Sequence, residues 1–176
     1  MAHSVNDRKM EEKVEKAYRD LKNEMGDAVG ETVTALDGMC TFFVKSAQIV
    51  RALKFLKEHA DGAFDMLTDL TAVDWLRHPE KGYRYEVVYH LCSTTNNHRM
   101  RIKVQVSEDE MSAPSVTGVY LGANWMEREV FDMFGLTFDG HPDLRRILLW
   151  EGFEGHPLRK DFPTRGLHPI ERTPHS

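Results

Sequence analysis

Apolar side chains recur at every third or fourth position in two stretches of the N-terminal third of the chain. Over residues 8–25 the stripe comprises Met10, Val14, Ala17, Tyr18, Leu21 and Met25. Over residues 47–59 it comprises Ile49, Val50, Leu53 and Leu56. This spacing places each set on one side of an α-helix, so the sequence predicts two amphipathic helices that each bury one side.

Five other stretches have the composition or the alternation typical of β-strands. They are residues 31–36, 39–44, 64–75, 85–91 and 100–106. Asp37 and Gly38 form a turn signal between the first two, which predicts a short hairpin. In the last two stretches apolar and polar residues alternate strictly, so each strand buries one face and exposes the other to water. Only the short loop 93–98 separates these two strands, which predicts an antiparallel pair.

The chain changes character after its last helical pattern. Residues 108–114 look like a polar linker, and residues 115–134 have a helical pattern that is interrupted near Gly122. From Gly135 onward the chain contains five of its seven prolines. Proline lacks the backbone donor that helices and sheets need, so we expect this end of the chain to be mostly extended or looped.

These elements predict an α+β fold with two layers, in which a mainly antiparallel sheet carries helices on one face and an extended C-terminal arm follows. We assign residues 1–135 to the α+β domain and residues 136–176 to an irregular arm rich in Pro, Gly and Arg. The arm is too irregular to form a core, and too rich in aromatic residues and arginine for a solvated tail. We therefore expect it to bind a partner, and to be the least ordered part of the isolated chain until a partner captures it.

The composition of the 176-residue chain narrows the function classes. A formal net charge of −5 argues against nucleic acid as the main partner. No apolar run approaches the ~18 residues of a membrane span. The first residues lack the basic start and apolar block of a signal peptide, so we expect a cytoplasmic protein.

The sequence offers no set of ligands for a redox cofactor. Its two cysteines, Cys40 and Cys92, are far apart, whereas an ordinary iron–sulfur cluster takes four cysteine ligands. The glycine-rich patterns that bind dinucleotides or phosphates do not occur in it. We expect both cysteines to be buried small side chains, and we expect no redox cofactor in this chain.

One carboxylate falls on the apolar side of the helix predicted to end at residue 134. On a helical wheel Glu127 lies within the apolar arc. The polar arc comprises Trp125, Arg128, Glu129 and Asp132. A buried carboxylate needs a partner or a proton, and the arginine fork suits a carboxylate. We therefore predict an ion pair between Glu127 and Arg145 or Arg146 of the arm; the alternative is a slightly rotated helix that leaves Glu127 in water.

The arm contains the tripeptide Gly-His-Pro twice, each time with Leu, Arg and a second basic residue close behind. One interpretation is a metal site formed by His141 and His156 with Asp139 and Asp143. The sequence lacks the short His-x-x-x-His or Cys-x-x-Cys spacing that makes metal motifs specific. Because a proline follows each histidine, the favoured interpretation is a pair of fixed turns in which the imidazole bonds to the backbone.

Three consecutive runs, residues 127–135, 140–148 and 155–163, together form a long signature. The residues that we assign to this signature and to partner docking are Glu127, Arg128, Glu129, Asp132, Gly135, Gly140, His141, Pro142, Leu144, Arg145, Arg146, Gly155, His156, Pro157, Leu158, Arg159, Lys160, Asp161, Phe162 and Pro163. The signature closely resembles that of the C-type subunit of NADH-quinone oxidoreductase, which is the thirty-kilodalton-type subunit of respiratory complex I. The resemblance covers most of the chain.

The resemblance implies a non-catalytic subunit of the peripheral arm of that complex. In this family the subunit carries no flavin and no cluster, packs against the hydrogenase-like large subunit that helps to form the quinone site, and wraps its C-terminal arm around that partner. NADH, FMN, iron–sulfur clusters and quinone would belong to the assembled, ion-translocating complex, on the cytoplasmic side of the membrane. The same domain occurs in membrane-bound hydrogenases and in coenzyme F420-dependent dehydrogenase complexes, which leaves the electron donor open.

Two other function classes stay open at this point. One is a stand-alone metal or acid–base enzyme that uses His141, His156, Glu127 and Asp132. The other is a free-standing adaptor that presents a basic row on the open face of the sheet to an acidic partner. This row comprises Arg99, Arg101 and Lys103. No recognised nucleophile signature supports the enzyme.

Overall fold

The computed structural model describes residues 5–34 and 36–165 of the chain. Its helices are α1 (Val5–Met25), α2 (Ile49–Glu58) and α3 (Ala123–Phe134), with 3-10 turns η1 (Gly26–Ala28), η2 (Ser46–Gln48) and η3 (Pro79–Lys81). Its strands are β1 (Val29–Thr34), β2 (Cys40–Val44), β3 (Met66–Asp74), β4 (Tyr85–Ser93), β5 (His98–Val106), β6 (Ser112–Pro114) and β7 (Thr137–Asp139). Both predicted N-terminal helices and the five predicted strands are therefore present.

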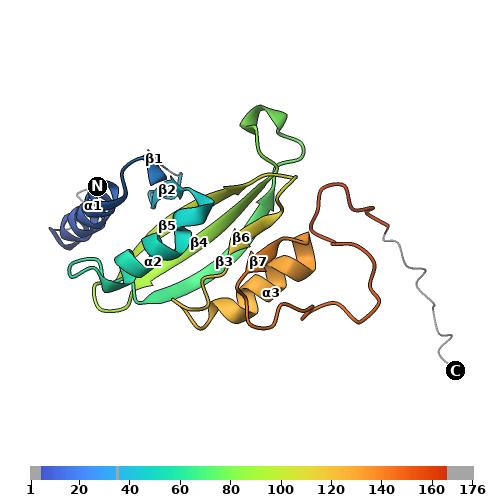
Figure 1. Cartoon of the computed structure of the whole chain (residues 1–176). Helices are drawn as coiled ribbons and strands as arrows, with labels where there is room; N and C mark the ends of the chain where they lie inside the picture. Colours follow the sequence, from blue (N-terminus) through green and yellow to red (C-terminus); the bar gives the residue numbers. More distant parts are fainter. Residues whose placement is uncertain (1–4, 35, 166–176) are drawn as a thin grey trace, which may run out of the picture.

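Five strands form one sheet in the order β1-β2-β5-β4-β3. The pairs β1–β2, β3–β4 and β4–β5 are antiparallel, and β2 runs parallel to β5. From β2 the chain crosses through α2 to the far edge at β3 and returns through β4 to β5, and a crossover of this length permits the parallel pair. In Figure 1, α2 and α3 lie in front of the sheet and α1 lies at its left end, near β1 and β2. The predicted two-layer α+β fold is confirmed.

The hydrophobic core lies between the sheet and the helices. On the inner face of β4 and β5, Tyr85, Tyr89 and Ile102 are fully buried. Opposite them, Leu21 of α1 and Leu53 of α2 come from the two stripes that the helical spacing predicted, and both are also fully buried. Each large apolar side chain removed from water in this way contributes ~1.5–3 kcal/mol.

Two predictions for the middle of the chain are wrong in detail. The expected linker 108–114 contains β6, which pairs in parallel with β7 to form a separate two-stranded sheet. The partner of β6 lies beyond α3. A strand of only three residues is too short to show an alternation that would predict this pairing. The helix expected from residue 115 begins only at Ala123, because residues 117–122 form turns instead.

The arm leaves α3 at Gly135 and runs around that helix, as Figure 1 shows. Apart from β7, the described residues 136–165 form turns, bends and irregular chain, as the prolines predict. Leu136 and Phe138 nevertheless belong to the hydrophobic core. The boundary at residue 135 stays a prediction, and the end of the predicted arm, 166–176, lies outside the described residues. Among the helices of the described part, none is long and apolar enough to span a bilayer.

Candidate partner-binding site on α3 and the C-terminal arm

A buried carboxylate on α3 holds a loop of the arm in place. Asp132 Oδ2 accepts hydrogen bonds from the backbone N–H groups of Ile147, Leu148 and Leu149 at 3.0, 2.8 and 2.9 Å. Arg146 Nη1 donates to the other carboxylate oxygen at 2.8 Å. Burial alone would raise the pKa of this carboxyl, but the three N–H groups and the guanidinium hold that pKa below its ordinary value. Asp132 is therefore charged at neutral pH and anchors the loop.

The two Gly-His-Pro histidines bind the backbone of the same helix. His141 Nδ1 accepts the N–H of Asp143 at 3.0 Å. The proton of the neutral ring is therefore on Nε2, which donates to the carbonyl of Asn124 at 3.1 Å. His156 Nδ1 donates to the carbonyl of Asp132 at 2.9 Å, and burial lowers the pKa of this imidazole. The predicted bonding of both histidines to backbone is confirmed.

Two arginines of the signature satisfy carbonyls of the irregular arm. Arg128 donates to the carbonyl oxygens of Arg145 and Arg146, in both cases at 3.1 Å. Arg146 itself donates to the carbonyl of Gly155 at 3.2 Å. Buried backbone carbonyls need hydrogen-bond donors, and an irregular segment has no neighbouring strand or helical turn to supply them. The arginine side chains supply these donors instead. These hydrogen bonds tie the arm to α3, and the low order expected of the arm in the isolated chain stays a prediction.

Glu127 is fully buried, as the helical wheel indicates. It contacts the segment before α3, whereas Asp132 contacts the loop of the arm. Its carboxylate accepts hydrogen bonds from Ser115 Oγ and from the N–H of Val116, each at 2.7 Å. The Nε2 of His141 lies 4.0 Å from the carboxylate. Burial raises the pKa of the Glu127 carboxyl, against the effect of these two donors. Glu127 therefore fastens α3 to the segment that precedes it.

The predicted ion pair between Glu127 and Arg145 or Arg146 is wrong. Arg146 pairs with Asp132, and Arg145 forms a pair with Asp143 at 2.9 Å on the surface. The wheel assigned Asp132 to the polar side of the helix, where a free carboxylate would meet water. The arm covers that side of α3, and the loop that buries Asp132 also supplies its cation and its N–H donors.

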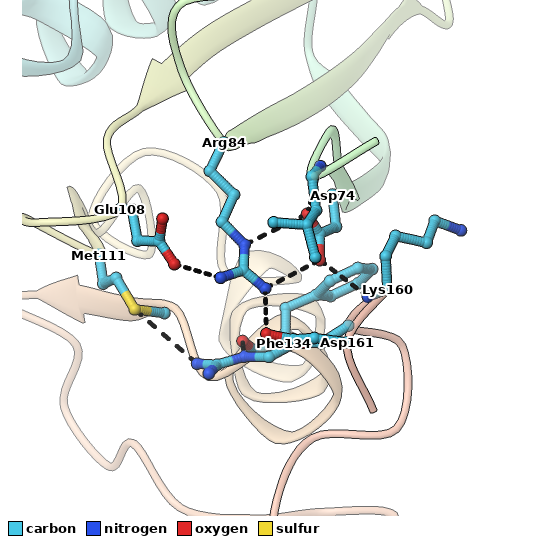
Figure 2. Close-up of polar contacts among 9 residues, drawn as sticks. Asp74, Arg84, Glu108, Met111, Phe134, Lys160 and Asp161 are labelled. Carbon is cyan, nitrogen blue, oxygen red and sulfur yellow. Dashed lines mark hydrogen bonds and ion pairs between the residues drawn. The ribbon is translucent and has the colours of Figure 1, made fainter. Parts of the chain in front are cut away.

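A second cluster of charges ties the end of the described arm to the sheet, as Figure 2 shows. Arg84, just before β4, contacts the carboxylates of Asp74 at 3.4 Å, Asp161 at 2.7 Å and Glu108. The buried Asp74 also accepts the N–H of Lys160 at 2.9 Å. Burial would lower the pKa of the Arg84 guanidinium, but its carboxylate partners raise that pKa. In turn the hydrogen bond from Arg84 lowers the pKa of the Asp161 carboxyl, so each partner of this pair stabilises the charge of the other.

Arg159 closes over the C-terminal end of α3 through its contacts with Phe134 and Met111. Its Nε donates to the carbonyl of Phe134 at 2.5 Å, and its Nη2 lies 3.8 Å from the sulfur of Met111. Gly135 ends the helix in the left-handed region, with φ +76°. A Cβ atom at this position would overlap Arg159 and His156. Glycine is required here both by the backbone angle and by the close approach of the arm.

The outer surface of α3 and the arm is apolar at several points. The exposed large apolar residues of this region are Leu121, Trp125, Leu148, Trp150 and Leu158. Leu148 is 62% exposed and Trp150 is 58% exposed. The Trp150 ring packs edge-on against Phe153 at 4.8 Å between centroids, and Phe153 stacks on Phe162 at 6.0 Å. Large apolar side chains left outside a well-formed core are typical of a binding surface.

The remaining signature residues shape the path of the arm or face solvent. Gly140 and Gly155 adopt positive φ angles of 85° and 86°. Leu144 packs against the core, and the N–H of Leu158 donates to the carbonyl of Met133 at 3.1 Å. Pro157 is half-buried, and the exposed residues are Glu129, Pro142, Lys160 and Pro163. The three runs of the signature thus meet around α3.

The basic row predicted on the open face of the sheet is largely neutralised within the chain. Arg101 donates to His90 Nε2 at 2.9 Å and pairs with Asp37 at 2.5 Å. Lys103 pairs with Glu86 at 2.6 Å. These contacts remove most of the free positive charge on which the adaptor hypothesis depends.

The metal hypothesis finds no ligand set in the described part of the chain, where no three or more His, Cys, Asp or Glu side chains are grouped to hold an ion. His141 and His156 point at backbone carbonyls of α3. Asp139 accepts a hydrogen bond from Ser112 Oγ at 2.8 Å. These candidate ligands are therefore engaged in contacts that shape the arm.

Sequence reasoning missed the sheet end of this site. The strict alternation around β4 assigned Arg84 to the solvent face, yet its side chain is only 9% exposed. Its partner Asp161 lies 77 residues further along the chain, and local sequence patterns do not predict contacts over such a separation. The one available signal is Asp74, a carboxylate at the end of β3 that must find a cation or donors if it is buried.

Comparison with known proteins places this geometry in a family. Residues 42–168, more than half of the chain, match the family described as the respiratory-chain NADH dehydrogenase 30 Kd subunit. The chain belongs to this family. The match begins in β2 and takes in α3 and the described arm, so the three signature runs and strands β3, β4 and β5 lie within the family region. The resemblance drawn from the signature is therefore confirmed.

Curated relatives of this 30 Kd subunit family are named as the C-type subunit of NADH-quinone oxidoreductase. One, from Caulobacter sp. (strain K31), is 58% identical over 119 residues, which is 68% of this chain and 54% of the relative. One from Caulobacter vibrioides is 47% identical over 157 residues, 89% of this chain and 77% of the relative. This chain thus spans about half the length of the first relative and about three quarters of the second.

Two solved structures share the fold of this family member. The trypsin-resistant fragment (1-134) of Nqo5 is 25% identical, with a TM-score of 0.61 over 75% of this chain and 99% of the fragment. A chain of the membrane-bound sulfane sulfur reductase, an archaeal respiratory membrane complex, is 26% identical, with a TM-score of 0.71 over 86% of both chains. The fold therefore recurs in Nqo5 and in a chain of an archaeal respiratory membrane complex.

Proposed function

We propose that this chain is a non-catalytic docking subunit in the peripheral arm of an NADH-quinone oxidoreductase, where α3 and the C-terminal arm bind the hydrogenase-like large subunit. The observation that carries the proposal is the apolar surface on the family signature. Leu148 and Trp150 stand out from a loop that is itself anchored to α3. A side chain exposed in this way gains free energy when a partner covers it.

The contacts of the titratable groups support a non-catalytic role. A catalytic acid or base must reach the proton of a substrate. His141 and His156 instead donate to carbonyls of α3, and Glu127 and Asp132 accept N–H groups of neighbouring loops. Each group that a stand-alone enzyme would need is used to hold the arm or the helix.

In the assembled complex this subunit would support electron transfer to quinone coupled to ion translocation, on the cytoplasmic side of the membrane. NADH, FMN, iron–sulfur clusters and quinone would be bound by other subunits. The likeness to the sulfane sulfur reductase chain favours, as a second candidate, the equivalent subunit of a related respiratory complex. The NADH-linked complex is preferred because identity rises to 58% among the relatives from NADH-quinone oxidoreductase, against 26% for that chain.

Co-expression of the tagged chain with the large subunit of its own organism tests the docking. We expect the wild-type chain to retain the large subunit through purification, and the double variant Leu148→Ser/Trp150→Ser to lose it. Val33→Ser is the matched control, because Val33 is 50% exposed but lies on β1, away from the arm. Circular dichroism should show all three proteins folded. The proposal fails if the wild-type chain does not retain the large subunit, or if the double variant retains it as well as the control does.

A further inference from the structure

The arm is rich in arginine, which suggests an electrostatic clamp on an acidic partner, but its arginines are largely committed within the chain. In the arm, Arg159 donates to a backbone carbonyl of α3 and Arg146 bonds the Asp132 carboxylate. Arg128, on α3 itself, donates to backbone carbonyls of the arm. The exposed cation nearest the apolar loop is Arg145, and it already pairs with Asp143. The loop of residues 146–150 therefore presents apolar side chains to a partner, while its one charged side chain, Arg146, is turned inward to Asp132.

The contacts of Asp132 explain why the apolar side chains point outward. Three successive N–H groups, from Ile147 to Leu149, converge on a single oxygen of the carboxylate. Successive amides can share one anion only if the backbone curls around it. In this curl Leu149 packs toward the core, whereas Leu148 and Trp150 are more than half exposed.

We propose that the buried Asp132 carboxylate prebuilds the loop of residues 146–150 in the free chain, so that Leu148 and Trp150 form rigid apolar anchors for an uncharged, apolar pocket of the large subunit. This inference rests on the proposed function for the identity of the partner. Asp132 is a positioning residue, because it touches the loop backbone and acts on the partner only through the two anchors. The arginines of the signature shape the arm, and the apolar anchors provide the contact.

Two physical consequences separate this arrangement from an electrostatic clamp. A loop that is already ordered loses little conformational entropy on binding, so its anchors bind more tightly than the same side chains on a flexible segment. Apolar contacts are not screened by salt, whereas ion pairs at an exposed interface weaken once the screening length falls to about 10 Å near 0.1 M salt. Affinity for the large subunit should therefore depend on Asp132 but hardly on ionic strength.

The experiment measures the affinity of the full chain for the purified large subunit, together with amide hydrogen exchange of the free chain. In the wild type we expect the amides of residues 147–149 to be protected, and the affinity to change less than about threefold between about 0.05 and about 0.5 M NaCl. Asp132→Asn should expose these amides and weaken binding by at least about tenfold, a coupling of the size that such networks show. Glu58→Gln, an exposed site on α2 outside the signature and the arm, is the control and should change neither readout.

Trp150→Ala gives a surface variant that leaves the Asp132 contacts intact. It should weaken binding while the amides stay protected, and adding Asp132→Asn to it should cost less affinity than Asp132→Asn alone, because both changes act through the same anchor. The proposal is overturned by unprotected amides in the wild type, by full affinity in either single variant, or by affinity that falls steeply with salt. If the wild-type chain does not bind the large subunit, the proposed function fails. The amide exchange of residues 147–149 in the wild type and in Asp132→Asn still tests whether Asp132 orders the loop.

Discussion

Arg84 offers the sharpest test of how the arm is fastened to the sheet. The guanidinium meets three carboxylates, and two of them, Glu108 and Asp161, are on the surface with 61% and 49% of their side chains exposed. The third, Asp74, is fully buried. We expect Arg84→Met to keep most of the apolar stem of the side chain in place and to remove the charge.

The burial of the carboxylate partners decides how much folding free energy each substitution removes. Removing one partner of a buried ion pair typically costs ~3–5 kcal/mol, because the other charge is left unpaired. After Arg84→Met, Asp74 would still accept the N–H groups of Leu76 and Lys160, both at 2.9 Å, which keeps the loss near the lower end, ~3 kcal/mol. Asp161→Asn and Glu108→Gln each break an exposed pair and should cost only ~0.2–1 kcal/mol.

Urea unfolding followed by circular dichroism measures these differences, and for a chain of this size a loss of ~3 kcal/mol lowers the melting temperature by roughly 6–12 °C. Amide exchange at Lys160 reports the arm itself, because that N–H bonds Asp74. The reasoning is refuted if Arg84→Met is no more destabilising than Asp161→Asn, or if the Lys160 amide stays as protected as in the wild type.

Three further predictions concern α3 and the glycine that ends it. Gly135→Ala should destabilise the chain by ~1–3 kcal/mol more than Gly140→Ala in urea titrations, because both positions have positive φ but only at Gly135 would the new methyl group meet Arg159 and His156; equal losses would contradict the close approach of the arm. Glu127→Gln should change the pH dependence of stability. The folded-state pKa of Glu127 is raised, so the folded chain binds the proton more tightly than the unfolded one, and the stability that this group contributes falls as pH rises from its ordinary value of about 4.3 through the folded pKa. The advantage of the wild type over Glu127→Gln should therefore shrink over that window, and an advantage that grows with pH would count against a buried, burial-perturbed carboxylate. The Asp132 pKa is lowered, so its contribution has the opposite sign: it is full above the ordinary value of about 3.9 and is lost as pH falls through the folded pKa, which the pH dependence of Asp132→Asn against the wild type checks.

The sequence by itself determined the elements whose pattern is local. The stripe through Val14 and Leu21 and the stripe through Leu53 predicted two helices, because each helix buries one side. The alternation around Tyr89 and Ile102 predicted the hairpin, because the side chains of a strand alternate between its two faces. The proline density of the arm predicted a mostly extended or looped chain, and the signature from Glu127 to Pro163 indicated the family. Each of these inferences needs only neighbours in sequence.

The tertiary structure alone decided which charges meet. A helical wheel gives the angle of Asp132 and Glu127 around α3, but not what covers each side of the helix. Here the arm buries Asp132. Ser115 and Val116 donate hydrogen bonds to the Glu127 carboxylate. The pairing of Arg84 with Asp161 joins residues 77 positions apart. Contacts between distant segments depend on the path of the whole chain, and no periodicity within a segment records that path.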